Sequence, residues 1–335
     1  MSSPLVRYVL GFCLVLAAAC ASVPPATPVG AQPVALEIRS QPLALKLDDP
    51  GLKRVGKLIW RGGISMTANS QNFGGWSDLY VSPDGRTLSS ISDLGSWLTA
   101  TVEYDAEGNL AGLRHGRIGS LRGLDGRPLA SKIDSDAEGM APMPDGSWIV
   151  SFERNHRIWR YPTLDGTPTP INLPPGFERQ PDNGGIEALT ALSDGTIIAI
   201  SEEYSLTPGS VVGWIGKPGA GRYTWQSFQY ASIPDFSPTA LAPLPDGGFV
   251  LLERAFDVAR GVRVRVMRAE LADFQPGGIA RPRELARLVS PLMVDNLEGV
   301  AATKGPRGET LLWLISDDNF NPMQRNLLLL FELEK

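Results

Sequence analysis

The 335-residue sequence has little cysteine, little histidine and no excess of positive charge. Its two cysteines, Cys13 and Cys20, lie in the first twenty residues, which excludes a disulfide scaffold, a cysteine zinc site and a thiol nucleophile from the rest of the chain. Lys and Arg number 31 against 36 Asp and Glu, and no stretch forms a basic stripe, so we expect no nucleic-acid partner. No Gly-x-Ser-x-Gly motif indicates a serine hydrolase, although a serine triad assembled from distant segments stays open with two histidines.

The first 19 residues have the pattern of an export signal. Arg7 precedes an apolar run of about a dozen residues, which is too short to span a bilayer. The following Leu16–Cys20 segment resembles a bacterial lipobox with Cys20 as the acylated residue, except that Ala17 stands where leucine is usual. Plain signal cleavage after Ala19-Cys20-Ala21 is the alternative. We therefore expect an exported bacterial protein, periplasmic or membrane-anchored through Cys20 alone, with a flexible linker at residues 20–41.

Glycine (36) and proline (28) make up nearly a fifth of the chain, which favours many turns over long helices. Four segments repeat an apolar strand, an Asp-Gly turn and a second apolar strand, with the aspartates at positions 84, 145, 194 and 246. A fifth copy at residues 296–317 has a longer turn. One inner hairpin plus two outer strands per period is the unit of a β-propeller, whereas a β-sandwich would not explain the period.

The sequence therefore predicts an all-β fold, a single β-propeller of four-stranded blades at residues 54–335. We count five blades, or six if one copy has diverged beyond recognition. The apolar segment at residues 326–333 is expected to be the third strand of the last blade, and residues 56–60 would supply the fourth and close the ring.

The Asp-Gly turns also predict which residues face each other. If each is the centre of a two-residue hairpin, Glu138 lies directly opposite Glu153, and Glu187 directly opposite Glu202. Opposed like charges are destabilising, and paired carboxylates either share a proton or take up a cation. A hard, oxygen-ligated divalent ion such as calcium suits such a site, because histidine is scarce and cysteine is absent.

Acids in other copies extend these pairs into an expected ring at one mouth of the channel. The candidate metal ligands are Glu138, Glu153, Glu187, Glu202, Glu298, Asp317, Asp78 and Asp93. The fourth copy departs from the pattern, because the same rule places Thr239 opposite Arg254. The alternative for each acid is a structural role, in which it caps backbone amides or pairs with Arg154 or Arg254.

Several motifs resemble those of an exported bacterial family, the phytase-like proteins with esterase-like activity. They are Asp136–Gly139 running to Pro144-Asp145-Gly146, Asn296–Val300, Ile315–Phe320 with Gln324-Arg325, and the closing Phe331–Leu333. The resemblance extends from about Phe73 to the C-terminus and implies a propeller and phosphoester hydrolysis. Carried over from the propeller phytases, it implies that the acids hold calcium and that Arg154, Arg325, His115 and His156 meet phosphate oxygens.

The sequence is compatible with three functions. The favoured one is a metal-dependent hydrolase of a phosphoester or related ester. The second is a non-catalytic, calcium-stabilised binding module. The third is a lactonase of the gluconolactonase kind, for which Asn183, Asn296 and Asn319 would be available as further ligands. In each case we expect a small-molecule partner and a monomer.

Overall fold

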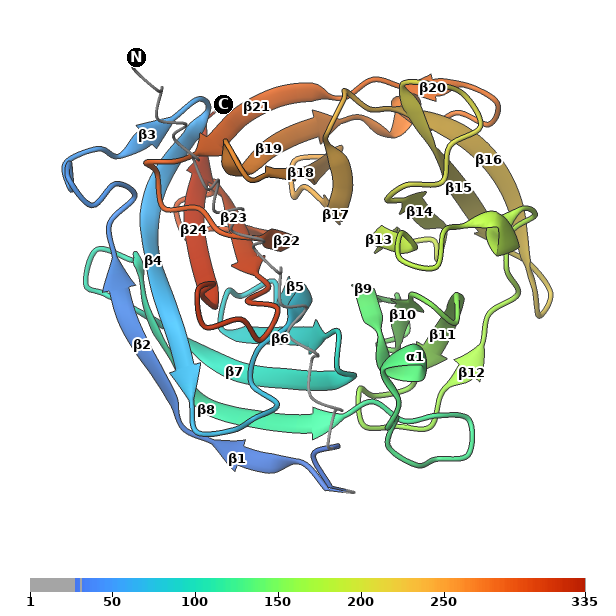
Figure 1. The fold of residues 1–335 in the computed structure, drawn as a ribbon, viewed down its shortest axis with the longest axis horizontal. Helices are drawn as coiled ribbons and strands as arrows, with labels where there is room; N and C mark the ends of the chain where they lie inside the picture. The colour runs from blue at the N-terminus through green and yellow to red at the C-terminus, as the bar shows by residue number, and fades with distance from the viewer. Residues whose placement is uncertain (1–27, 31, 335) are drawn as a thin grey trace, which may run out of the picture.

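The computed structural model describes residues 28–30 and 32–334 and confirms a five-bladed β-propeller (Figure 1). The predicted export signal and Cys20 lie outside the described residues. Within the described part, no helix has the length and apolar character needed to cross a membrane.

Each blade begins at the central axis and runs outward through antiparallel strands, except that the short outermost β20 of blade 3 is parallel to β16. Blade 1 consists of β5 (Trp76–Val81), β6 (Thr87–Ser92), β7 (Ser96–Tyr104), β8 (Leu110–Ser120) and the edge strand β1 (Val34–Leu36). Blade 2 consists of β9 (Ala137–Pro142), β10 (Trp148–Phe152), β11 (Arg157–Tyr161) and β12 (Thr169–Pro170). Blade 3 consists of β13 (Ile186–Ala191), β14 (Ile197–Ser201), β15 (Ser210–Pro218), β16 (Tyr223–Ala231) and the short β20 (Ile279–Ala280).

The last two blades follow the same plan. Blade 4 consists of β17 (Ser237–Pro243), β18 (Phe249–Asp257), β19 (Gly261–Ala269) and β21 (Arg283–Val289). Blade 5 consists of β22 (Leu297–Lys304), β23 (Thr310–Ser316), β24 (Leu327–Leu333), β4 (Leu58–Ala68) and β2 (Ile38–Leu43), with β3 (Arg54–Val55) beside β4. The described helices are short: α1 (Lys132–Ser135) and the 3-10 turns η1 (Phe177–Arg179) and η2 (Leu271–Asp273).

The predicted closure of the ring is confirmed, because the N-terminal β4 pairs with the C-terminal β24, for example Ile64 with Leu328. The linker expected at residues 20–41 is not confirmed over its last part. Residues 34–36 and 38–43 form β1 and β2, which pair with β8 and β4. Both lie at sheet edges, where Pro42 is tolerated because an edge position does not require every N–H donor.

The hydrophobic core is divided among the gaps between neighbouring blades. The buried side chains of the described residues form five clusters, one in each gap, and fully buried Trp76, Trp214 and Trp313 are among the largest members. The inner strands of each blade therefore bury apolar side chains on both faces of the sheet. This packing holds the five inner strands around the axis and fixes their ends relative to one another.

The two faces of the propeller differ in their loops. The turn face carries the Asp-Gly turns, which join the first and second strands of a blade. The mouth face carries most of the longer segments, notably residues 121–136 with α1, residues 171–185 with η1, and residues 317–326, whereas residues 270–282 with η2 begin and end on the turn face. Longer loops on one face of a rigid scaffold are where binding and catalytic residues usually lie.

Candidate functional site

A β-bulge near the start of every inner strand shapes the mouth. The register between the first two strands shifts at this point in all five blades. When the five blades are aligned at these register shifts, each has one residue at the bulge. From blade 1 to blade 5 these residues are Ser77, Glu138, Glu187, Thr239 and Glu298. A bulge re-aims the side chain it carries, and here it occurs on the strand closest to the axis.

The second strand of each hairpin delivers another residue to the same level. Four acids follow directly after these strands, Asp93, Glu153, Glu202 and Asp317, and each donates its backbone N–H to a residue just before the adjacent inner strand. The fifth equivalent is Arg254 in β18, whose backbone partner is Ser237. The propeller therefore presents two residues per blade at its mouth.

The predicted opposition of Glu138 to Glu153 and of Glu187 to Glu202 is wrong in register. In blade 2 the connection has three residues, with Met143 paired to Ser147 and Gly146 in a left-handed conformation at φ 83°. Together with the bulge, this shift places Asp136, rather than Glu138, opposite Glu153. In blade 3, Glu202 pairs with Gly185, and in blade 4, Arg254 pairs with Ser237 instead of Thr239.

The carboxylates nevertheless converge. One oxygen atom from each of Asp136, Glu138 and Glu153 lies within 4.8 Å of the others, and the same holds for Glu153, Glu187 and Glu202. Glu153 belongs to both groups. Together these five residues, which we call the carboxylate cluster, lie between blades 2 and 3, so the acids meet across blades as well as within them.

Burial and mutual repulsion disfavour ionisation in this part of the mouth. Desolvation, followed by neighbouring carboxylates, raises the pKa of Glu138 and of Glu187 well above the ordinary glutamate range. Desolvation also raises the pKa of Glu153, and that of Glu298 in blade 5, to about 7. Residue Glu187 is 8% exposed, and its Oε2 atom has no hydrogen-bond partner among the described residues. A buried carboxylate oxygen without a donor is costly unless a proton or a cation accompanies it.

Three cations stand around the cluster. Arg254 lies 3.5 Å from carboxylate oxygens of both Glu202 and Glu298, longer than a strong charged hydrogen bond. The Lys132 ammonium group lies 2.7 Å from Asp93 and 2.5 Å from Asp136, and Arg154 Nε lies 2.5 Å from the other oxygen of Asp136. Sequence reasoning does not select Lys132 or Asp136 as site residues, although Asp136 begins one of the family motifs and the two residues have i,i+4 spacing before β9.

Three of the remaining candidate ligands are already engaged within the chain. Asp78 is buried and accepts hydrogen bonds from the backbone amides of Leu79 and Met140, both at 2.8 Å, so it ties blade 1 to blade 2. Asp93 is held by Lys132. Asp317 accepts the Asn319 amide at 2.6 Å, and desolvation followed by the nearby Glu298 raises its pKa. Among these, Asp78 has the structural role considered as the alternative.

The predicted phosphate ligands are divided between different parts of the molecule. Arg154 reaches the mouth, and its Nη2 donates to Asn183 at 3.0 Å. Arg325 lies in the mouth-face loop after β23 and pairs with Asp295 at 3.1 Å. His156 Nε2 lies 2.8 Å from the Pro181 carbonyl oxygen, beside Gly185. His115 is exposed on the outer strand β8, so it does not join the mouth.

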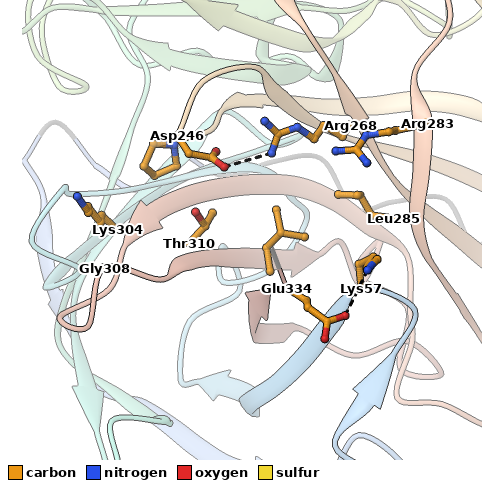
Figure 2. A pocket seen from close by; sticks show the side chains of 11 residues that line it. Lys57, Asp246, Arg268, Arg283, Leu285, Lys304, Gly308, Thr310 and Glu334 are labelled. Carbon is orange, nitrogen blue, oxygen red and sulfur yellow. Dashed lines mark hydrogen bonds and ion pairs between the residues drawn. The ribbon is translucent and has the colours of Figure 1, made fainter.

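A central cavity and a cleft on the turn face lie apart from these acids. Beneath the mouth, a central cavity of about 80 Å³ is lined mainly by apolar residues of the five inner strands, including Met140, Leu241 and Val300. On the turn face, a cleft of about 510 Å³ lies between blades 4 and 5 (Figure 2). Its lining includes four cations and two acids, which are Lys57, Arg268, Arg283, Lys304, Asp246 and Glu334.

Solved structures similar to this chain share low identity with it. They include a putative gluconolactonase (13% identity, covering 88% of this chain and 94% of that chain, TM-score 0.43). An α-L-arabinofuranosidase from Podospora anserina, solved with cellotriose, is 11% identical over 83% of this chain and 97% of its own, with a TM-score of 0.46. A luciferin-regenerating enzyme is 12% identical over 87% of this chain and 95% of its own, with a TM-score of 0.40. At these levels the similarity says nothing about the reaction.

No curated protein sequence matches the chain. A family model does, over residues 71–320, which is most of the chain. That model describes the phytase-like domain, "Esterase-like activity of phytase". Its span includes all five inner hairpins and every member of the carboxylate cluster. This protein therefore belongs to the phytase-like family.

Proposed function

We propose that the protein is a metal-dependent hydrolase of a phosphoester or related ester, and that its reaction takes place at the carboxylate cluster. The observation that carries the proposal is the Oε2 atom of buried Glu187, which has no partner in the described part of the chain and lies within a group of converging carboxylates. Membership of the phytase-like family supports hydrolysis of an ester. The position of the cluster, on the face with the longer loops, supports a role beyond packing.

The donor set fits a hard divalent cation. The two groups that share Glu153 offer only carboxylate oxygens, which calcium prefers over nitrogen or sulfur ligands. Asp136, Glu138 and Glu153 would hold one ion, and Glu153, Glu187 and Glu202 would hold the same ion or a neighbouring one. A cation bound there would polarise an ester oxygen and lower the pKa of a bound water.

The chain's own cations have two tasks in this proposal. Lys132 and Arg254 offset part of the negative charge of the mouth through ion pairs with Asp93, Asp136, Glu202 and Glu298. Arg154 is anchored through Nε to Asp136 and through Nη2 to Asn183, which leaves Nη1 to donate to an oxygen of the substrate.

His156 is positioned to accept a proton. Its Nε2 faces the carbonyl oxygen of Pro181, so the neutral ring carries its hydrogen on Nε2 and a lone pair on Nδ1. The Nδ1 atom is buried and has no partner in the described part of the chain. A methyl group added at Gly185 would lie 3.1 Å from Nδ1 and 3.3 Å from Glu153 Cγ, so both side chains border the same small space.

Calcium titration by calorimetry, followed by assays with p-nitrophenyl phosphate, p-nitrophenyl acetate and a sugar lactone, tests the proposal. We expect calcium to bind and one ester class to be hydrolysed, and Glu187→Gln with Glu138→Gln to abolish both. Asp145→Asn, in a turn on the opposite face, is the matched control. If no divalent ion binds and the double variant keeps its activity, the proposal is wrong. Tight binding without turnover would instead favour the binding module.

Export through the N-terminal signal is part of the same proposal, because calcium is abundant outside the bacterial cytoplasm. Cell fractionation and palmitate labelling of the wild type and of Cys20→Ser test it. We expect an exported, labelled wild type and an unlabelled variant. An exported but unlabelled wild type would indicate plain signal cleavage, and retention in the cytoplasm would contradict export.

A further inference from the structure

A second cleft opens on the mouth face, between blades 3 and 4. Its volume is about 530 Å³, and Glu202 of the carboxylate cluster forms part of its wall. The cleft therefore begins where the proposed reaction takes place and extends outward from the axis. A single substrate can contact the cluster with its reacting group and the cleft with the remainder.

The lining of this cleft has a distinct chemistry. It includes four serines and three acids, and no lysine, arginine or histidine: Ser205, Ser210, Ser232, Ser237, Glu202, Glu203 and Asp235. The cleft in Figure 2 has the opposite character, because four of its lining residues are cations. Phosphate groups are bound by arginine and lysine, so a substrate carrying several phosphates does not match the cleft at the mouth.

Some of these polar groups are already satisfied and others are free. Ser205 and Ser210 both donate to the Thr207 carbonyl oxygen at 3.0 Å. Arg254 pairs with Glu202, and Arg260 pairs with Asp235 at 3.0 Å. Among the described residues, the Ser232 and Ser237 hydroxyls and the Glu203 carboxylate make no hydrogen bond or ion pair. Two hydroxyl groups, which can donate or accept a hydrogen bond, and one carboxylate, which accepts, are therefore available to a ligand.

The apolar part of the lining also narrows the ligand class. Phe236 is the cleft's aromatic residue, but the guanidinium carbons of Arg263 and Arg265 lie 5.2 Å and 5.5 Å from its ring centre. Its ring is therefore not free to form a platform for a substrate cation. Ile233 is 41% exposed and, with Pro234, offers an aliphatic surface for C–H groups.

We propose that this cleft binds a neutral, polyhydroxylated group of the substrate, such as a sugar or cyclitol ring. The substrate would then be a monoester or inner ester of a polyol, with its single reacting group at the carboxylate cluster. Hydroxyl groups of the ring would donate to Glu203 and exchange hydrogen bonds with Ser232 and Ser237. The assignment rests on the proposed function for the position of the reacting group, but binding in the cleft does not require turnover.

Ligand-detected NMR with D-glucose and myo-inositol, in the presence of EDTA, tests the cleft separately from catalysis. We expect millimolar binding, weakened about threefold to tenfold by Ser237→Ala and by Ser232→Ala, since each removes one uncharged hydrogen bond. Thr310→Val, in the cleft of Figure 2, should leave binding unchanged. Inositol hexakisphosphate should not displace the neutral polyol.

The outcomes separate the two proposals. Polyol binding that depends on Ser232 and Ser237, without turnover of any ester, supports the cleft assignment and contradicts the hydrolase. If an ester is turned over but no polyol binds, or if polyol binding is unchanged in both serine variants, the cleft assignment is wrong. The hydrolase proposal is then still supported by the turnover. Displacement of the polyol by inositol hexakisphosphate at a lower concentration than by free sugar would also overturn it. Circular dichroism of each variant confirms that it is folded.

Discussion

The buried acids at the mouth should make the metal-free protein more stable at mildly acidic pH than at alkaline pH. Glu298 carries the argument, because it is buried and desolvation raises its pKa from 4.5 to about 7. In the unfolded chain the same carboxyl group titrates at its ordinary value. Between pH 4.5 and about 7, this carboxyl group holds a proton in the folded state that it has lost in the unfolded state. The resulting stabilisation is fully present below pH 4.5 and is lost as the pH rises through about 7.

The size of the effect follows from the difference between the two pKa values. A change from 4.5 to about 7 corresponds to roughly 3 kcal/mol for one group. Glu153 shifts in the same direction to a similar value. Lowering the pH from 8 to 5.5 should therefore raise the free energy of unfolding by a few kcal/mol. For a chain of this size that is an increase in Tm of about 5 °C or more. Surface aspartates such as Asp145 have lowered pKa values and titrate below this window.

Differential scanning calorimetry between pH 5.5 and 8.5 in EDTA measures this dependence directly. Adding calcium at pH 8 should raise Tm and flatten the profile, because the ion replaces the missing protons as the partner of the carboxylates. Glu298→Gln should be more stable than the wild type at pH 8 and similar to it at pH 5.5. A Tm that falls on acidification from pH 8 to 6, together with no response to calcium at pH 8, would refute the reasoning.

Three further substitutions separate structural from functional groups. Asp78→Ala should lower the free energy of unfolding in urea by about 2–4 kcal/mol, because it leaves two buried backbone amides without an acceptor. Calcium affinity should not change, and a loss of calcium binding would show that Asp78 is a ligand. Arg254→Met should lower the free energy of unfolding by about 3–5 kcal/mol at pH 8 and by far less at pH 5. An equal loss at both pH values would show that Arg254 is not the counter-ion of Glu202 and Glu298. Tyr230→Phe removes the 2.8 Å hydrogen bond to Glu253 in blade 4 and should cost about 2 kcal/mol without affecting turnover.

The fold could be predicted from the sequence because its main signal is a repeat. Asp84, Asp145, Asp194 and Asp246 each mark a turn between two apolar strands, and the period between them is set by the number of strands in a blade. The closing strand was also predictable, since a propeller needs its last blade completed by one of the chain ends. The edge strands β1 and β2 were missed, because β1 has three residues and β2 contains a proline, so that this segment resembles a linker.

The details of the site could not be predicted in the same way. An Asp-Gly pair fits both a two-residue turn and a three-residue turn with glycine in the left-handed position, and the two differ by one residue in register. A single residue of shift changes which side chains are opposed, as Glu138 and Glu153 show. The bulges carry no sequence signal of their own. Lys132 comes from a long mouth-face loop without periodicity, so only the folded structure brings it to Asp93 and Asp136.

The departures from fivefold repetition explain where a cation would bind. If every blade carried a glutamate at the bulge and an acid after the second strand, the mouth would be a uniform ring of charge with no preferred position. Blades 1 and 4 break the pattern with Ser77 and Thr239 at the bulge, and blade 4 also replaces the acid with Arg254. Lys132 neutralises the blade 1 side, and Arg254 neutralises the sides of blades 3 and 5 that border blade 4. Glu138, Glu153 and Glu187 form no ion pair with a cation of the described residues, and two groups of oxygen ligands overlap there.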